Sequence, residues 1–286
     1  MKMQNNMFDL PATPAPVTLA KFNEDGYSVK GCTIIYAPKG QAGEYSPLAT
    51  NPYRGCGHAC AYCYVPQVIK MMDRAVFDAG AVPRPGFLDN LKKDARKYQA
   101  LGSTGQVMLS FTSDVYNPFD TSLTRPTIEV LKAHGLGFSV LTKGGSRALA
   151  DIDLYRPDRD AFASTLTSLD DKFSKLWERG AALPQDRMDT LKKFHEAGIF
   201  TWVSCEPTLD IEATLAIIEQ TRGYVDFFKI GRVNYVGLTK TTDWESFTHR
   251  VIDLCQKYDI KHYIKLDLQK YLPAGYPNVM RINQHN

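Results

Sequence analysis

Three closely spaced cysteines, Cys56, Cys60 and Cys63, have the clearest potential for chemistry in this chain. Thiolates spaced C-x₃-C-x₂-C can converge on one metal centre, and soft sulfur ligands favour an iron–sulfur cluster, zinc or Cu(I). A structural zinc site usually has four ligands in two pairs, and no second C-x₂-C follows here. His58 could in principle be a fourth ligand, but its position between two of the cysteines makes tetrahedral reach awkward. We therefore expect an iron–sulfur cluster, with zinc as the alternative.

The elements that must position these cysteines follow from the pattern of apolar residues. Residues 30–50 contain a short apolar run that predicts a lead-in strand and loop. Later runs, rich in β-branched and aromatic residues, predict buried strands because they are nearly continuous in apolar character. These strands are expected at residues 106–112, 137–142, 161–167, 200–206, 226–230 and 261–266.

Segments with helical spacing alternate with the predicted strands. They span residues 124–135, 184–198, 211–223 and 243–258, and the first three end on a glycine, which is a natural helix terminator. Alternating strands and helices indicate a parallel sheet with right-handed crossovers. We predict an α/β fold, a partial or full parallel (β/α) TIM-like barrel over residues 31–270. An N-terminal arm (1–30) and a C-terminal tail (271–286) would flank it.

Polar residues gather where the predicted strands end. In barrels of this kind the active site lies at the C-terminal ends of the strands. Several such clusters in register predict a cavity lined by polar groups. The clusters are residues 112–114, 142–143, 167–168, 204–206 and 229–234.

The cysteine spacing, with Tyr62 just before the last cysteine, resembles the signature of the radical S-adenosylmethionine (SAM) superfamily. The resemblance implies a [4Fe–4S] cluster on Cys56, Cys60 and Cys63, whose fourth iron is free to bind the amino and carboxylate groups of SAM. It also implies reductive cleavage of SAM to a 5′-deoxyadenosyl radical, which abstracts hydrogen from a substrate C–H bond. Tyr62 would pack near the adenine, or simply beside the cluster.

The wider run NPYRGCGHACAYCYVP resembles the spore photoproduct lyase branch of that superfamily, and weaker likeness extends from about residue 31 to 266. By this resemblance Ser113 and Asp114 face SAM, Lys143 pairs with its carboxylate, and Ser164 makes a further contact. Arg187 could bind the carboxylate instead through its forked guanidinium. We expect Arg187 to be a plain arginine on a helix surface.

One departure from the branch concerns the hydrogen donor. The spore lyase uses a cysteine near the end of the second barrel strand, and residues 108–117 contain none. Cys205 is a candidate replacement, although a buried cysteine often acts only as a small apolar residue. Tyr116 or Tyr235 could also serve. The resemblance therefore implies a nucleobase, nucleotide or DNA substrate, with modification of a nucleotide ahead of lesion repair.

Two further polar groups leave alternatives open. Glu206 would place a carboxylate over the barrel mouth, where it could bind substrate or pair with Lys229 or Arg232. The segment KIGRVNY (229–235) could form a nucleotide-binding lip or a solvated loop.

Bulk composition narrows the class of protein. The 286 residues are 44% hydrophobic and 23% charged, which is typical of a globular protein. The net charge of +3 permits a phosphate-bearing partner without arguing for one. With no signal-like start and no apolar run near the ~20 residues that span a bilayer, we expect a cytoplasmic protein without a membrane partner. Its expected reductant is a flavodoxin or ferredoxin.

Two other functions compete with a radical enzyme. A nucleic-acid-binding protein with a structural cluster would need a fourth cysteine ligand and a more basic face. A zinc protein would contain zinc and no iron, so elemental analysis would identify it.

Overall fold

The computed structural model describes residues 21, 23–68, 72–234 and 242–280. Its central element is a seven-stranded sheet in the order β1-β4-β5-β6-β7-β8-β9, in which every neighbouring pair is parallel. Among the described residues the edge strands β1 and β9 do not pair, so the sheet forms a partial barrel. The strands are β1 (Leu48–Thr50), β4 (Val107–Leu109), β5 (Phe138–Thr142), β6 (Ala161–Thr165), β7 (Phe200–Thr208), β8 (Phe227–Arg232) and β9 (His262–Ile264).

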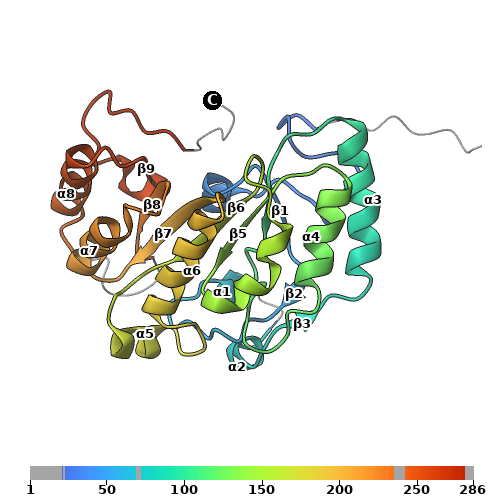
Figure 1. Cartoon of the computed structure of the whole chain (residues 1–286), viewed down its shortest axis with the longest axis horizontal. Coiled ribbons are helices and arrows are strands. Elements are labelled where there is room, and N and C mark those ends of the chain that lie inside the picture. The colour runs from blue at the N-terminus through green and yellow to red at the C-terminus, as the bar shows by residue number, and fades with distance from the viewer. Residues whose placement is uncertain (1–20, 22, 69–71, 235–241, 281–286) are drawn as a thin grey trace, which may run out of the picture.

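Helices connect the strands and cover the outer face of the curved sheet (Figure 1). The two-stranded sheet and the short helices α1, α2 and α5 gather at one end of the molecule, at the bottom of this view. The helices are η1 (Gly40–Glu44, 3₁₀), α1 (Val65–Val68), α2 (Arg74–Asp78), α3 (Phe87–Ala100), α4 (Thr124–Ala133), η2 (Gly145–Leu154, 3₁₀), α5 (Asp171–Trp177), α6 (Pro184–Glu196), α7 (Ile211–Thr221), α8 (Trp244–Lys257) and α9 (Leu266–Gln269). The small sheet pairs β2 (Tyr53–Arg54) with β3 (Val82–Pro83).

Alternate side chains along each strand point to opposite faces of the sheet. Ala163 and Trp202 belong to a small cluster inside the barrel, whereas Phe162 and Val203 belong to the large core between sheet and helices. On β7, therefore, the positions two and four residues after Trp202, Ser204 and Glu206, also face the interior.

The predicted α/β fold is confirmed, and each predicted strand and helix has a counterpart. The lead-in strand is β1, which pairs with β4. Helix α3, the 3₁₀ helix η2 and helix α5 were not predicted. Most of the expected N-terminal arm and the last six residues lie outside the described residues, so those domain boundaries stay predictions.

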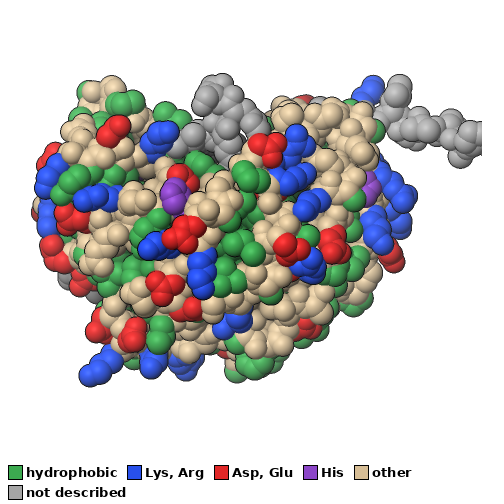
Figure 2. Space-filling view, viewed as in Figure 1, with side chains coloured by type: hydrophobic (Ala, Val, Ile, Leu, Met, Phe, Trp, Pro, Cys, Tyr) green, Lys and Arg blue, Asp and Glu red, His purple; other side chains and the backbone are tan. Residues whose placement is uncertain are grey.

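The distribution of charged and apolar residues bears on which partners the protein could bind. On the face shown in Figure 2, basic and acidic side chains intermingle over most of the surface. No helix among the described residues is both long and apolar enough to span a bilayer.

Candidate functional site

The cysteine loop begins directly after β2 and is held by main-chain hydrogen bonds. The Cys56 N–H donates to the Phe77 carbonyl at 2.8 Å, and the Cys63 N–H donates to the Cys60 carbonyl at 3.0 Å. Gly55 has a φ of +77°, and a Cβ there would lie 2.2 Å from the Gly80 carbonyl oxygen. Only glycine therefore fits at the start of this turn.

The segment that follows α5 pairs with the cysteine loop from the other side. The Ala61 N–H donates to the Trp177 carbonyl at 2.8 Å, and the Gly180 N–H donates to the His58 carbonyl at 2.9 Å. Cys60 and Glu178 form an isolated antiparallel bridge. The loop is thus fixed by two parts of the chain that lie about 100 residues apart.

The three thiols lie near enough to influence one another's pKa. Burial and neighbouring charges raise the pKa of Cys60 to about 12, and Cys63 is among the groups that contribute. Burial also raises the pKa of Cys56, with smaller contributions from Asp114, Cys60 and Cys63. Yet no three His, Cys, Asp or Glu side chains in the described part of the chain lie close enough to hold one metal ion. The described residues thus bring the three thiols near one another but do not arrange them around a single ion.

His58 is committed to hydrogen bonds that leave it no lone pair for a metal. Its Nε2 lies 3.0 Å from Nη2 of Arg147, which can only donate, so Nε2 accepts. Its Nδ1 must then carry the hydrogen and donate to Oδ2 of Asp114 at 3.2 Å. The structure therefore argues against His58 as a fourth ligand.

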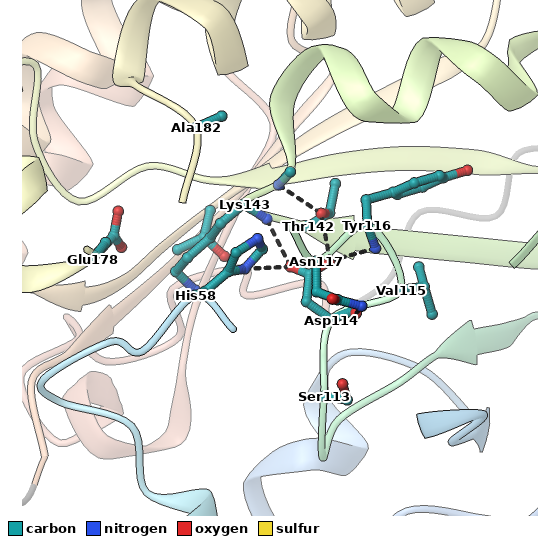
Figure 3. Close-up of polar contacts among 12 residues, drawn as sticks. His58, Ser113, Asp114, Val115, Tyr116, Asn117, Thr142, Lys143, Glu178 and Ala182 are labelled. Carbon is teal, nitrogen blue, oxygen red and sulfur yellow. Dashed lines mark hydrogen bonds and ion pairs between the residues drawn. The ribbon is translucent and has the colours of Figure 1, made fainter. Parts of the chain in front are cut away.

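The Asp114 carboxylate accepts four hydrogen bonds, which connect the cysteine loop to the ends of β4 and β5 (Figure 3). Its Oδ1 accepts from the Tyr116 N–H and the Thr142 hydroxyl, and its Oδ2 accepts from the Lys143 N–H as well as from His58. Burial alone would raise the pKa of Asp114, but His58, Thr142 and the Lys143 amide hold it well below the usual 3.8. Sequence reasoning predicted contact with SAM and missed this bracing role; the SAM contact stays a prediction.

Lys143 places a half-buried cation beside the cysteine loop. Its Nζ lies 5.6 Å from the centre of the Tyr62 ring, within cation–π range. Burial would lower the pKa of Lys143, but Cys60 and Glu178 raise it above the usual 10.5. Lys143 and Tyr62, both predicted to contact SAM, therefore lie together next to the thiols. Their contact with SAM itself stays a prediction.

Arg187 was expected on a helix surface, and that expectation is wrong. Its side chain is buried and its Nη2 lies 2.5 Å from Oε2 of Glu178. The guanidinium also donates to the carbonyls of Ala182 and Thr165. Glu178 also accepts a hydrogen bond from the Tyr62 hydroxyl. Arg187 therefore helps to position Tyr62 through the carboxylate that both residues contact. With its donors used in this way, it does not serve a SAM carboxylate.

The two predicted serines differ in position. The Ser113 hydroxyl donates to the Gly55 carbonyl at 2.5 Å, so Ser113 lies against the cysteine loop, and its contact with SAM stays a prediction. Ser164 follows Ala163, which faces the interior, so it lies on the helix side of β6 and donates to the Thr142 carbonyl at 2.9 Å. In this structure Thr165, not Ser164, takes the interior position on β6, and the contact of Ser164 with SAM stays a prediction.

The predicted hydrogen donors are not placed as expected. Cys205 is buried in the core between sheet and helices, on the face of β7 opposite to Ser204, so its thiol is turned away from the interior. Tyr116 is buried too, and its hydroxyl donates to Asp151 at 3.0 Å. These positions do not favour either residue as a hydrogen donor, and both roles stay predictions. Tyr235 lies outside the described residues, so it stays a prediction.

Glu206 pairs with other partners than those expected. It forms an ion pair with Lys265 and accepts from the Tyr45 hydroxyl, whereas Arg232 lies 3.7 Å from Asp267. Sequence reasoning missed Tyr45 and Lys265 because neither belongs to a motif. Lys265 does lie at the end of the strand predicted at residues 261–266, which was the available signal.

Comparison with known proteins agrees with this geometry. The family model described as the radical SAM superfamily matches residues 50–221. An uncharacterized protein of Methanocaldococcus jannaschii is 26% identical over 182 residues, covering 62% of this chain and 67% of that protein. Another, from Acidianus two-tailed virus, is 27% identical over 202 residues, covering 67% and 66%.

Solved structures share the fold at low identity. A mutant of spore photoproduct lyase has a TM-score of 0.64 at 12% identity, covering 82% of this chain and 79% of that one. SuiB of Streptococcus suis bound to S-adenosylmethionine has a TM-score of 0.59 at 14% identity, covering 79% of this chain and 52% of that one. The chain thus corresponds to about half of SuiB. Because the family model matches more than half of its residues, the chain belongs to the radical SAM superfamily.

Proposed function

We propose that this protein is a radical SAM enzyme that holds a [4Fe–4S] cluster on Cys56, Cys60 and Cys63. When bound, the cluster and SAM supply an electron and a 5′-deoxyadenosyl radical that can remove hydrogen from an unreactive C–H bond. The observation that carries the proposal is a loop with three thiols whose nearest other candidate ligand, His58, is already hydrogen-bonded to Asp114 and Arg147.

The chain's own residues prepare a site for SAM beside this loop. Lys143 supplies the cation for its carboxylate, since a buried charge-assisted contact both binds and orients. Tyr62 offers a ring at the same place, held by the hydrogen bond from its hydroxyl to Glu178. Arg187 neutralises that carboxylate and leaves Lys143 to pair with the ligand.

The substrate we propose is a nucleobase, a nucleotide or DNA. Support comes from the sequence resemblance to spore photoproduct lyase and from the shared fold. Modification of a nucleotide is favoured over repair of a photolesion, because no cysteine of the described residues other than the cluster cysteines faces the interior. A structural cluster in a nucleic-acid-binding protein is less well supported, since His58, the other candidate ligand in the cysteine loop, is already hydrogen-bonded to Asp114 and Arg147.

The electron donor we propose is a flavodoxin or ferredoxin. We also propose a cytoplasmic location, because the cluster thiolates must stay reduced.

The test is formation of 5′-deoxyadenosine by anaerobically reconstituted protein with dithionite and SAM. Wild type is expected to form it, Cys60→Ala is expected to form none, and Cys32→Ala should behave as wild type because Cys32 lies outside the loop. Zinc at one atom per chain with iron near zero would contradict the proposal. Transfer of deuterium from labelled nucleosides into 5′-deoxyadenosine would then identify the substrate.

A further inference from the structure

A second polar group lies inside the barrel, on the side of β7, β8 and β9. It is built around the 3₁₀ helix η1, whose last residue is Glu44. The Lys229 Nζ donates to the carbonyls of Glu44 and Tyr45 at 2.6 and 3.2 Å. Glu44 Oε1 accepts from the Tyr263 hydroxyl at 2.9 Å and from the Leu266 N–H at 2.7 Å. These bonds fix η1 against the sheet and hold Tyr45 in the interior.

Glu206 meets Tyr45 there with only one of its two oxygens in use. Its Oε2 accepts from both the Tyr45 hydroxyl and the Lys265 ammonium. Gly231 leaves room for the carboxylate, since a Cβ there would lie 2.9 Å from Oε1. Oε1 has no hydrogen-bond partner among the described residues, and the side chain is 17% exposed. A carboxylate oxygen is therefore available in the interior.

An aromatic wall stands beside this oxygen. The Tyr45 ring lies 6.1 Å from Phe111 and 5.8 Å from Trp202, centre to centre. Tyr45 and Phe111 are half-buried, so both residues remain partly accessible. Flat aromatic surfaces beside a polar anchor suit a planar ring, because bases stack on such side chains regardless of sequence.

We propose that Glu206, with Phe111 and Tyr45, forms the subsite that recognises the substrate's base. The base stacks on the aromatic wall and donates an N–H to Oε1 of Glu206. This inference rests on the proposed function and deepens it by naming the recognised edge, an N–H donor. The adenine of SAM offers the same chemistry, so the experiment separates the two sources.

Glu206→Gln tests the hydrogen bond at constant shape. Tyr45 and Lys265 both donate to Oε2, so the amide oxygen must occupy that position. The new NH₂ group then replaces Oε1 and faces the N–H of the base, donor against donor. A good contact between a side chain and a base edge discriminates by about 1–3 kcal/mol, so affinity should fall about 5- to 150-fold.

The measurement is anaerobic calorimetric titration of reconstituted protein, saturated with SAM, with the four deoxynucleosides and their ring-N- or amino-N-methylated partners. At least one nucleoside should bind, and its methylated partner should bind about 5-fold more weakly or worse. Glu206→Gln should lose affinity for that nucleoside, and so should Phe111→Ala, which removes the stacking surface. Glu212→Gln is the matched control, because Glu212 is exposed on α7 and pairs with Arg250. Circular dichroism checks that each variant is folded.

Three results would overturn the inference. No nucleoside binds, or the methylated partner binds as tightly as its parent, or Glu206→Gln binds the base as wild type does. If Glu206→Gln weakens SAM binding instead, the carboxylate serves the adenosyl group and the inference is wrong. Should wild type bind a base through Glu206 yet form no 5′-deoxyadenosine, only the proposed function fails.

Discussion

Replacing Asp114 with asparagine is expected to loosen the cysteine loop. The amide nitrogen must take the place of one oxygen, and each oxygen now serves two donors: Tyr116 and Thr142 on Oδ1, His58 and Lys143 on Oδ2. Two buried donors then lose their acceptor in either orientation. At about 1–3 kcal/mol each, the free energy of unfolding should fall by about 2–6 kcal/mol.

Urea titration of metal-free, reduced protein at pH 7, followed by circular dichroism, measures this loss. Asp158→Asn is the control, because Asp158 is exposed and its change should stay within about 0.5 kcal/mol. Iron bound per chain after reconstitution should also drop in Asp114→Asn, since His58 lies between two cluster cysteines.

The effect of Asp114→Asn on the free energy of unfolding should also depend on pH. The folded-state pKa of Asp114 lies below its usual 3.8, so its stabilisation is complete above about pH 5 and is lost as the pH falls further. The difference in free energy of unfolding between wild type and Asp114→Asn should therefore become smaller as the pH falls from 5 to 3. A difference below about 0.5 kcal/mol at pH 7, or one that does not change with pH, would refute the bracing role of this carboxylate.

Further variants test the rest of the site. Lys143→Met should weaken SAM binding about 10-fold or more in equilibrium dialysis, whereas Lys175→Met on the exposed face of α5 should not; equal affinities would contradict the role of Lys143. Gly55→Ala should bind less iron than Gly102→Ala, because both glycines have positive φ but only Gly55 is crowded by backbone; equal iron would contradict the crowding. Arg187→Ala should lower the free energy of unfolding by about 3–5 kcal/mol in urea titration, because it leaves the buried Glu178 carboxylate without its cation. A loss under about 1 kcal/mol would show that the ion pair contributes little.

The fold was predictable because strand and helix periodicities are local. The runs at residues 137–142 and 161–167 correspond to β5 and β6 almost residue for residue. Helix α3 was missed although its buried residues Leu91, Ala95 and Tyr98 recur at helical spacing, because polar residues dominate between them. Pattern alone therefore found the sheet more readily than a polar amphipathic helix.

The site was predictable only where residues are close in sequence. The three cysteines and Tyr62 stand in one motif, so their proximity could be foreseen. Arg187 lies on α6 and Glu178 follows α5, so the pair depends on how the turn between the two helices folds. Tyr45 meets Glu206 across more than 150 residues, which leaves no local pattern. The faces on which Ser164 and Cys205 lie were hard to predict for a different reason: a shift of one residue along a strand turns a side chain to the other face.

The central claim is that three cysteines hold a cluster that also binds SAM. Electron paramagnetic resonance of the dithionite-reduced, reconstituted protein, recorded before and after addition of SAM, tests it most directly. We expect a reduced [4Fe–4S] signal whose g-values shift when SAM is added. A signal that SAM leaves unchanged, or protein that takes up no iron, would contradict the account.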